Sequence, residues 1–498
     1  MNAIDKLKSR FSELLQLNYI SNLLGWDQRV YMPPSRDSAK GRSEQLALIQ
    51  AISHKKLISE KTGKLIKQVE QISDLNLIES ALLREAKRKY EKAIKIPTDL
   101  VVEIAKTSSL GNQAWEESRA KSDFNIFRPY LEKMVQLMQE YAEKINIGPT
   151  LYDSLIDTYE PGATSEWISK IFNELKPKFV KILDKIKDSS NKPDQAILKM
   201  SYDPVKQLKF SNEILKKIHF DFNIGRQDES VHPFTSTISS RDVRITTRVS
   251  ENLLPTCIFG TIHECGHALY EMGFNEELYN TFLADGSSLG IHESQSRLWE
   301  NIVGHSREFW NYWYPILQKY FPENLKNYPE DEFYLAINTV QPSFIRVEAD
   351  EVTYGLHIIL RFEIEKQLIN DNLSISEVPQ IWNNQMEDLL GIFPPDDAKG
   401  VLQDVHWSGG GFGYFPTYTL GNLYASQMYA TALKENPALT EDFKEGNFQN
   451  FLKYLRENIH QHGRIYRPLE LLKKATGEEL NPQHFIRYLE NKFYSIYK

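Results

Sequence analysis

The segment His263-Glu264-Cys265-Gly266-His267 holds two imidazoles four positions apart, with a carboxylate beside the first. On a helix, positions i and i+4 lie one above the other on the same face, so both imidazoles can bind one metal ion. Glu264 follows the first histidine directly and can take a proton from a water molecule at that ion. The pattern therefore predicts a metal-dependent hydrolase in which His263 and His267 are ligands and Glu264 is the general base.

A catalytic zinc site needs a third protein ligand and leaves a fourth position open. Glu293 is the predicted third ligand, because the chain after His267 is long enough for a helix end, a loop and a return. Glu271 and His292 remain alternatives. Glu271 would share one straight helix face with both histidines, which crowds a tetrahedral centre. Two imidazoles with one carboxylate suit Zn²⁺.

A glycine-rich stretch at residues 408–413 separates His406 from Tyr414. Such a loop can bring both side chains to a bound substrate, where each donor to the oxyanion of a tetrahedral intermediate stabilises it by about 2.7–4 kcal/mol. The glycines do not form a phosphate-binding loop, because no Gly-Lys-Ser/Thr follows them. Considered alone, His406 and Tyr414 would each be structural more often than catalytic.

Helices must position these residues, since apolar side chains recur at i, i+3 and i+4 along much of the chain. A strand is predicted within 232–250, where Val243, Ile245 and Thr247 alternate with polar residues, and a small sheet should line one wall of the metal site. No repeat of fixed period and no low-complexity linker occurs, so one domain over residues 1–498 is expected. The predicted helices cover residues 4–24, 79–95, 128–145, 165–187, 256–272, 293–314, 361–370 and 448–458.

The composition argues against several classes of protein. The chain has 498 residues, of which 41% are hydrophobic, and a net charge of −8 at pH 7. This charge argues against a nucleic-acid partner, because phosphate binding needs clustered cations. No apolar run approaches about 18 residues and the N-terminal segment lacks the apolar core of a signal peptide, so a cytoplasmic protein without a membrane span is expected. Cys257 and Cys265 would be separated by about 12 Å of helix rise, too far for a disulfide.

The motifs together resemble those of the M32 family of metallocarboxypeptidases, of the carboxypeptidase Taq type. The HExxH motif is followed by His292-Glu293-Ser294-Gln295-Ser296, which matches the family's HES[MQ]S segment. Shorter similarities extend the resemblance over nearly the whole chain. Three further motifs match at their defining positions, namely DxRxT at 242–246, IRxxAD at 345–350 and GxxQDxHW at 400–407.

This resemblance implies a mainly α, neurolysin-like helical fold with a deep central groove, and a homodimer. It also implies the release of single residues from peptide C-termini with broad preference, using zinc, for which cobalt often substitutes. His406 and Tyr414 resemble the oxyanion-binding pair of the related angiotensin-converting and oligopeptidase families. Carried over residue by residue, the family's metal ligands and catalytic base match His263, His267, Glu293 and Glu264.

An exopeptidase must bind the free α-carboxylate of its substrate, and a guanidinium does so with two parallel hydrogen bonds. Arg244 and Arg346 lie within two of the motifs and are the candidates, with Arg346 preferred. Asp350 either pairs with Arg346 or orients a metal-binding imidazole. Two other functions stay open: a zinc endo-oligopeptidase on the same fold, and an inactive peptide-binding or assembly protein. The intact Glu264 argues against the inactive protein.

Overall fold

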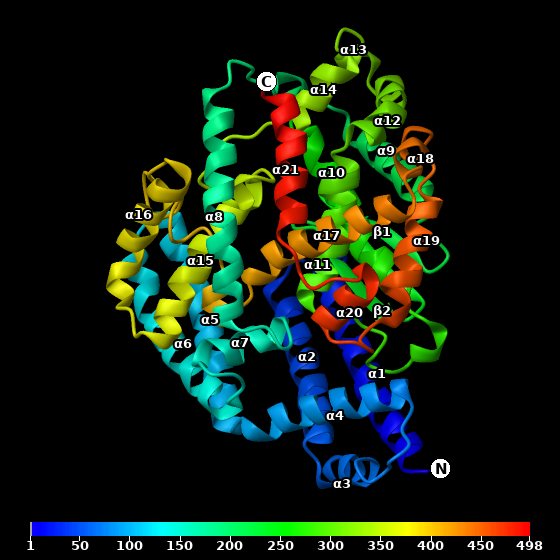
Figure 1. Cartoon of the computed structure of the whole chain (residues 1–498). Coiled ribbons are helices and arrows are strands. Elements are labelled where there is room, and N and C mark those ends of the chain that lie inside the picture. Colours follow the sequence, from blue (N-terminus) through cyan, green and yellow to red (C-terminus); the bar gives the residue numbers. More distant parts are fainter. Residues whose placement is uncertain (1) are drawn as a thin grey trace. The chain divides into compact units, whose positions relative to one another are not determined.

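Helices form most of the regular structure, as the periodicity predicted, and one three-stranded sheet accompanies them (Figure 1). The structure is a computed structural model that describes residues 2–498. The chain folds into two compact units, and the expectation of one domain over 1–498 stays a prediction. The first unit comprises Met1–Ile94, Pro193–Ile337 and Tyr424–Leu480, and the second comprises Lys95–Lys192, Asn338–Leu423 and Asn481–Lys498.

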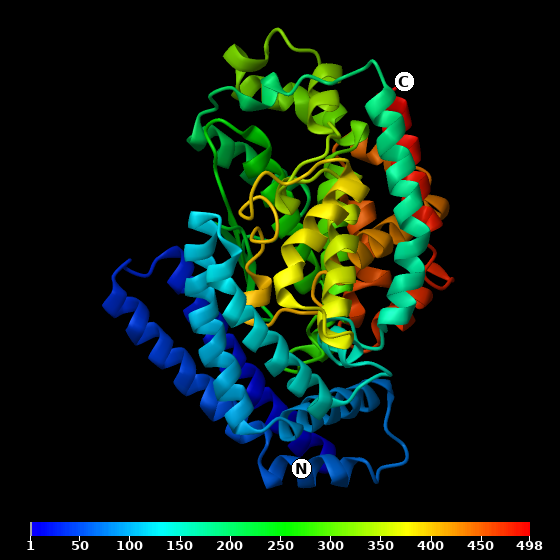
Figure 2. The ribbon, with the colours of Figure 1, turned by 90° about the vertical axis from the view of Figure 1, so that its left-hand side faces the viewer.

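The first unit contains the N-terminal helices, the sheet and the HExxH segment. Its helices, with short 3-10 or π segments written η, are α1 (Ala3–Val30), α2 (Arg36–Leu57), α3 (Glu60–Val69), α4 (Leu77–Lys95), η1 (Ala196–Lys199), α9 (Pro204–Lys217), α10 (Leu254–Glu271), η2 (Glu276–Leu278), α11 (Leu289–Arg297), η3 (Leu298–Gly304), α12 (Arg307–Tyr320), α13 (Pro322–Leu325), α14 (Glu330–Ile337), α18 (Leu439–Lys444), α19 (Gln449–Asn458), η7 (His460–His462) and α20 (Pro468–Thr476). Helices α1 and α2 lie side by side (Figure 2). Helix α17 (Pro416–Glu435) begins in the second unit and ends in the first.

One helix predicted from the sequence is wrong, because residues 293–314 do not form a single helix. Helix α11 ends at Arg297, the π-helical segment η3 follows, and the chain turns before α12 begins. The side chain of Ser306 caps α12 by accepting a hydrogen bond from the Phe309 N–H at 3.1 Å. Apolar residues of η3 such as Leu298 and Val303 are fully buried, so the apolar spacing continues past the end of α11 and conceals it.

The sheet has the strand order β1-β3-β2, with β1 (Gly225–Glu229), β2 (Thr235–Ser239) and β3 (Asp242–Thr247). The central strand β3 is parallel to β1 and antiparallel to β2, with Ile245 paired to Thr235. The predicted strand region therefore contains two strands. Strand β1 was not predicted, because its sequence Gly-Arg-Gln-Asp-Glu has no apolar alternation. Val243 and Ile245 of β3 are fully buried, and β3 packs on α10.

Helix α10 is the core helix of the first unit, and buried residues occur on all of its sides. Helix α11 packs closely on it near Gly266. A β-carbon at Gly266 would lie 2.5 Å from the carbonyl oxygen of Gln295 and 2.6 Å from Cα of Ser296. Glycine at this position therefore lets the backbone of α11 approach the helix that carries both histidines.

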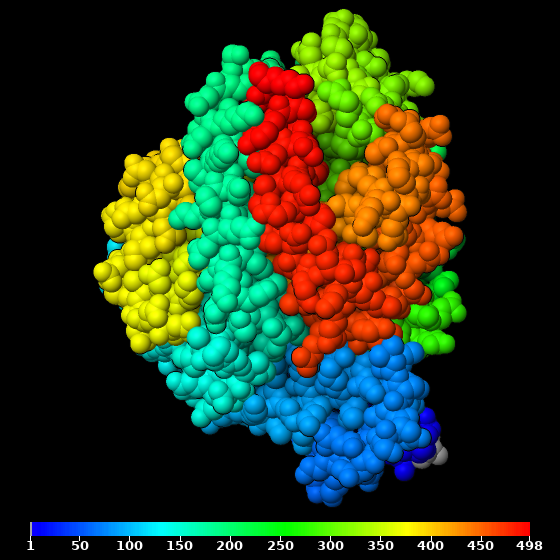
Figure 3. Space-filling model, viewed as in Figure 1, coloured from blue at the N-terminus to red at the C-terminus, as the bar shows by residue number. Residues whose placement is uncertain are grey.

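The second unit is helical and carries the glycine-rich stretch, in which Gly410 and Gly413 have φ of 76° and 84°. Its helices are α5 (Thr98–Lys121), α6 (Phe124–Ile145), α7 (Leu151–Tyr159), α8 (Ser165–Asp188), η4 (Arg346–Glu348), α15 (Thr353–Asn370), η5 (Ile375–Glu377), α16 (Val378–Leu390), η6 (His406–Gly409) and α21 (Gln483–Ile496). Helices α8 and α21 lie side by side at the surface (Figure 3), where Phe179 meets Phe485 edge-on with ring centroids 5.9 Å apart.

Among residues 2–498, no helix is both long and apolar enough to cross a membrane. Cys257 and Cys265 are both free and buried. Burial raises the pKa of the Cys265 thiol well above its ordinary value, so this cysteine stays protonated between the two histidines.

Candidate active site

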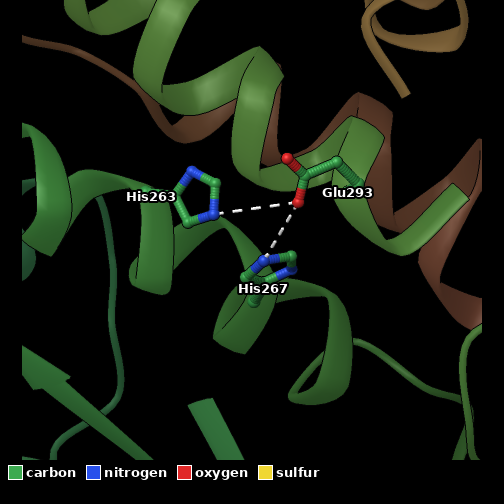
Figure 4. Close-up of side chains that lie close together, drawn as sticks. All are labelled: His263, His267 and Glu293. Atoms are coloured by element: carbon green, nitrogen blue, oxygen red, sulfur yellow. Dashed lines mark ion pairs between the residues drawn. The ribbon is translucent and has the colours of Figure 1, made fainter. Parts of the chain in front are cut away.

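Three side chains of the first unit point toward one another where α10 meets α11 (Figure 4). Nε2 of His263 and Nε2 of His267 lie 3.8 and 3.5 Å from Oε2 of Glu293. All three candidate ligand atoms lie within 4.8 Å of one another. Ligands at about 2.0–2.2 Å from a tetrahedral zinc ion are about 3.3–3.6 Å apart, so these residues fit such an ion after small side-chain adjustments. The structure thus brings together the three predicted ligands.

Glu300 of η3 lies behind His263 and fixes the orientation of its ring. Nδ1 of His263 lies 2.7 Å from Oε2 of Glu300, which leaves Nε2 facing Glu293. Burial raises the pKa of Glu300, but the charge of His263 and its hydrogen bond outweigh burial and lower this pKa to about 2. Burial lowers the pKa of His263, yet the charges of Glu300 and Glu293 outweigh it and raise this pKa to about 9. A metal ion bound at this nitrogen would therefore have to displace a proton from His263.

Arg297 and Ser296 hold the Glu293 carboxylate in place. Nε of Arg297 donates to Oε1 of Glu293 at 2.6 Å, and Oγ of Ser296 donates to Oε2 at 3.1 Å. Arg297 and Glu300 were not predicted from the sequence. Both follow Glu293 at i+4 and i+7, which places them on one helix face, and this spacing was the signal that could have found them.

The two alternative ligands lie behind His267. Nδ1 of His292 is 2.6 Å from Nδ1 of His267, and Nε2 of His292 is 2.8 Å from Oε1 of Glu271. Burial, with the charges of neighbouring histidines, lowers the pKa of His267 well below its ordinary value. Burial also lowers the pKa of His292, but the hydrogen bond and charge of Glu271 outweigh it and raise this pKa. The geometry therefore favours Glu293 as the third ligand, since His292 and Glu271 contact each other.

Glu264 on α10 is 6% exposed, and its side chain contacts strand β2 of the sheet. Oγ1 of Thr235 on β2 donates to Oε2 of Glu264 at 2.6 Å and lies 3.1 Å from its backbone carbonyl oxygen. The sheet thus contacts the site, as the sequence predicted. Burial raises the pKa of Glu264, which brings it closer to neutrality, where a general base works best.

The second unit places His406 beside Tyr414 and Phe415. The ring centroid of His406 lies 5.3 Å from that of Tyr414 and 4.7 Å from that of Phe415. Nδ1 of His406 is 3.8 Å from Oδ1 of Asp404. Burial lowers the pKa of His406 to about 4, although the charge of Asp404 opposes this effect. His406 is therefore neutral near pH 7.

Asp404 binds two buried arginines of the second unit. Nη2 of Arg346 donates to Oδ1 at 2.7 Å, and Nε of Arg361 donates to Oδ2 at 2.7 Å. Burial raises the pKa of Asp404, but the two guanidinium charges outweigh it and hold this pKa below its usual range. Asp350 instead lies just before α15 and accepts hydrogen bonds from the N–H and Oγ1–H of Thr353 at 2.9 and 2.8 Å. Asp404, which no prediction assigned a role, is thus the partner of Arg346.

Glu365 of α15 holds the glycine-rich stretch. Its Oε2 accepts hydrogen bonds from the Gly413 N–H at 2.8 Å and the Tyr152 hydroxyl at 2.6 Å, and Oε1 accepts one from Trp407 Nε1 at 2.7 Å. Burial raises the pKa of Glu365 to about 7. Glu365 was not predicted from the sequence, in which its only signal is a carboxylate within an apolar helical stretch.

Arg244, the other candidate for the substrate carboxylate, lies on β3. Its Nε and Nη2 donate to the two oxygens of Asp242 at 2.8 and 2.7 Å, and its guanidinium lies 4.3 Å from the ring centroid of Trp26. The side chain of Arg244 is 17% exposed and that of Arg346 is 5% exposed. A guanidinium has five N–H groups, so neither arginine spends all of them on its aspartate. Which one binds substrate stays a prediction.

Comparison with known proteins decides the family. The family model described as carboxypeptidase Taq (M32) metallopeptidase matches residues 6–493. The chain belongs to the M32 family. The expected enzyme class is thereby confirmed, and the chain is a metallocarboxypeptidase.

Individual M32 relatives match over nearly their full length. Carboxypeptidase 1 of Bacillus subtilis is 40% identical over 494 residues, which cover 98% of each chain. Thermostable carboxypeptidase 1 of Thermus thermophilus is 40% identical over 97% of each chain. The M32 carboxypeptidase from Deinococcus radiodurans R1 has a crystal structure that matches with a TM-score of 0.97 and 36% identity over 100% of both chains. The expected mainly helical fold class is confirmed.

Proposed function

We propose that this metallocarboxypeptidase uses a zinc ion to release single amino acids from the free C-termini of peptides, with broad preference for the residue released. The observation that carries the proposal is the convergence of His263, His267 and Glu293 at distances that fit a metal ion. Two imidazoles and one carboxylate with an open position are typical of catalytic zinc. Co²⁺ would also fit this ligand set and is proposed as a substitute.

A bound Zn²⁺ supplies Lewis-acid chemistry, which polarises the scissile carbonyl and makes water a nucleophile near neutral pH. The protein supplies the proton transfers. Glu264, whose pKa is raised by burial, takes the proton from the attacking water at its carboxylate and passes it to the leaving amine. Thr235 keeps the Glu264 carboxylate in one orientation through its 2.6 Å hydrogen bond.

His406 and Tyr414 are proposed to donate hydrogen bonds to the oxyanion. Their rings lie together in the second unit, and His406 is neutral near pH 7, so its imidazole can donate from one nitrogen. The bonds from Trp407 and Gly413 to Glu365 support a fixed conformation of the loop that carries both residues. A donor placed in advance needs no reorganisation during the reaction.

Arg346 and Arg244 are proposed as the groups that bind the substrate's α-carboxylate. The proposal rests on the bidentate geometry that guanidinium offers a carboxylate. Substitution of the residue that performs this role by Lys should raise KM for peptides with a free C-terminus, because Lys is a point charge without the planar fork. The arginine whose substitution leaves KM unchanged has no part in substrate binding.

The cellular setting is likewise proposed. The enzyme is expected to act as a cytoplasmic homodimer on peptide substrates, without nucleic-acid or membrane partners. A net charge of −8 argues against binding to nucleic acid or to an anionic membrane surface. Homodimerisation rests on the family resemblance, and light scattering of the purified protein tests it.

Mass spectrometry of one peptide tests the activity. The peptide is supplied with a free or an amidated C-terminus, and each form is incubated with and without a chelator. We expect stepwise loss of single residues from the free form only, abolished by the chelator. Internal cleavage of both forms would instead indicate a zinc endo-oligopeptidase and would remove Arg244 and Arg346 from carboxylate binding. A protein that takes up no metal would support an inactive binding protein.

A further inference from the structure

His267 differs from His263 in what lies behind it. A carboxylate, Glu300, contacts Nδ1 of His263 directly at 2.7 Å. Behind His267 stands a second histidine, His292, with its Nδ1 2.6 Å from Nδ1 of His267, and the carboxylate of Glu271 follows at 2.8 Å from Nε2 of His292.

The hydrogen bonds from His267 through His292 to Glu271 all run in one direction, with each donor pointing toward Glu271. A metal ion on Nε2 of His267 requires the lone pair of that nitrogen, so the ring proton of His267 sits on Nδ1. Nδ1 of His292 must then accept this hydrogen bond, which puts the proton of His292 on Nε2. Nε2–H in turn donates to Oε1 of Glu271. Each nitrogen has one partner of the opposite kind, and Oε2 of Glu271 accepts from Oγ1 of Thr237 on β2 at 2.9 Å.

Packing fixes the His292 ring between its two partners. A β-carbon at Gly286 would lie 2.9 Å from Cδ2 of His292, so a larger residue at position 286 would displace the His292 ring. The ring of Tyr270 lies on α10 with its centroid 5.5 Å from that of His292. Both ring nitrogens of His292 are used by His267 and Glu271, which leaves none for a metal ion.

We propose that His292 and Glu271 form a positioning relay that holds His267 in the tautomer and orientation required for metal binding. The relay deepens the proposed function, because it rests on His267 as a metal ligand. Their assigned role is to position His267, not to contact the substrate. Carboxylates that orient a metal-binding imidazole directly change metal affinity by about 10- to 100-fold when lost. Glu271 acts on His267 through a second imidazole, and the same order of effect is expected for His292.

The test is Zn²⁺ affinity of the full-length protein, measured without peptide by competition with a chelator of known affinity. His292→Phe should weaken Zn²⁺ binding by about 10- to 100-fold, and Glu271→Gln, which keeps shape and removes charge, by about 10-fold. Because Glu271 acts through His292, the double variant should bind Zn²⁺ as weakly as His292→Phe alone. The visible ligand-field bands of the Co²⁺-loaded protein should shift in both single variants, since the His267 ring changes orientation.

The matched control is His462→Phe. His462 is a half-buried histidine of the same unit whose ring packs edge-on against Tyr466 with centroids 5.3 Å apart, and its loss should leave the Zn²⁺ affinity and the Co²⁺ bands unchanged. The relay would be overturned if His292→Phe bound Zn²⁺ within about twofold of the wild-type affinity. It would also be overturned if the loss of affinity in the double variant equalled the product of the losses in the two single variants. If His292→Phe does not fold, Glu271→Gln decides, and wild-type Zn²⁺ affinity in that variant overturns the relay.

This outcome is independent of the peptide experiment. A wild-type protein that binds Zn²⁺ but cleaves no C-terminal residue would contradict the proposed function while the relay could still be measured. Unchanged Zn²⁺ affinity in the relay variants, with C-terminal cleavage intact, would contradict the relay alone.

Discussion

Gly266 of α10 lies against the backbone of Gln295 of α11 so closely that a β-carbon would stand 2.5 Å from the Gln295 carbonyl oxygen. A contact of this kind cannot relax by moving the end of a flexible side chain, because the obstructing atoms belong to the backbone. The spacing between the two helices therefore depends on this glycine. Because α10 carries both histidines and α11 carries Glu293, the distances between these three candidate ligands also depend on Gly266.

Gly266→Ala is expected to push α11 away from α10. Overpacking of this kind typically costs about 1–3 kcal/mol of stability, and the displaced Glu293 should weaken metal binding. Thermal melting and the metal content after dialysis measure the two effects. Gly260→Ala on the same helix is the control, because a β-carbon there meets only Cγ of Pro233 at 3.8 Å. Equal metal content in both variants would contradict the proposed role of Gly266.

Glu300→Gln is expected to weaken metal binding by about 10- to 100-fold, because the variant loses the charge that orients His263 and increases its basicity. Chelator competition measures this affinity. Glu276→Gln is the control. Glu276 is exposed in the 3-10 segment η2 of the same unit, so its substitution changes the net charge by the same amount as Glu300→Gln but should leave the metal affinity unchanged. If both variants bind metal as the wild type does, Glu300 does not support the site.

The two candidate imidazole ligands could be predicted from the sequence because their chemistry follows local spacing. His263 and His267 lie one helical turn apart, and the glycine run at 408–413 marked a loop. The supporting residues could not be found in this way. His292 and Glu271 were each weighed as ligands, and only their three-dimensional placement shows that they contact each other behind His267. The contact of Arg346 with Asp404 joins residues far apart in the chain. The end of α11 was missed because apolar periodicity continues through η3.

Tyr414→Phe is expected to lower kcat with little change in KM, because the hydroxyl is proposed to contact the oxyanion mainly in the transition state. Loss of one oxyanion donor typically costs about 10²- to 10³-fold in kcat. Steady-state kinetics on a peptide with a free C-terminus measures both constants. A change confined to KM would place Tyr414 in ground-state substrate binding instead.

The lowered pKa of His406 predicts a loss of stability in acid. Burial shifts this pKa from its ordinary 6.5 to about 4, so between these values the unfolded chain binds more protons than the folded one. The stability that His406 contributes is therefore present above pH 6.5 and is lost as the pH falls to about 4. Over this pH range, the unfolding free energy of the His406→Gln variant should fall by roughly 3 kcal/mol less than that of the wild type. Urea titrations at each pH measure it, and parallel curves for both proteins would contradict the shift.

The role of Glu264 is tested most directly by measuring metal content and turnover in the same samples of wild type and Glu264→Gln. The amide keeps the shape of the side chain and removes its ability to accept a proton. We expect the variant to retain the wild-type metal content, because His263, His267 and Glu293 are unchanged, while kcat falls by about 10²- to 10⁴-fold. A metal-loaded variant that keeps more than about a tenth of the wild-type kcat would contradict Glu264 as the general base. Loss of the metal would make Glu264 a ligand.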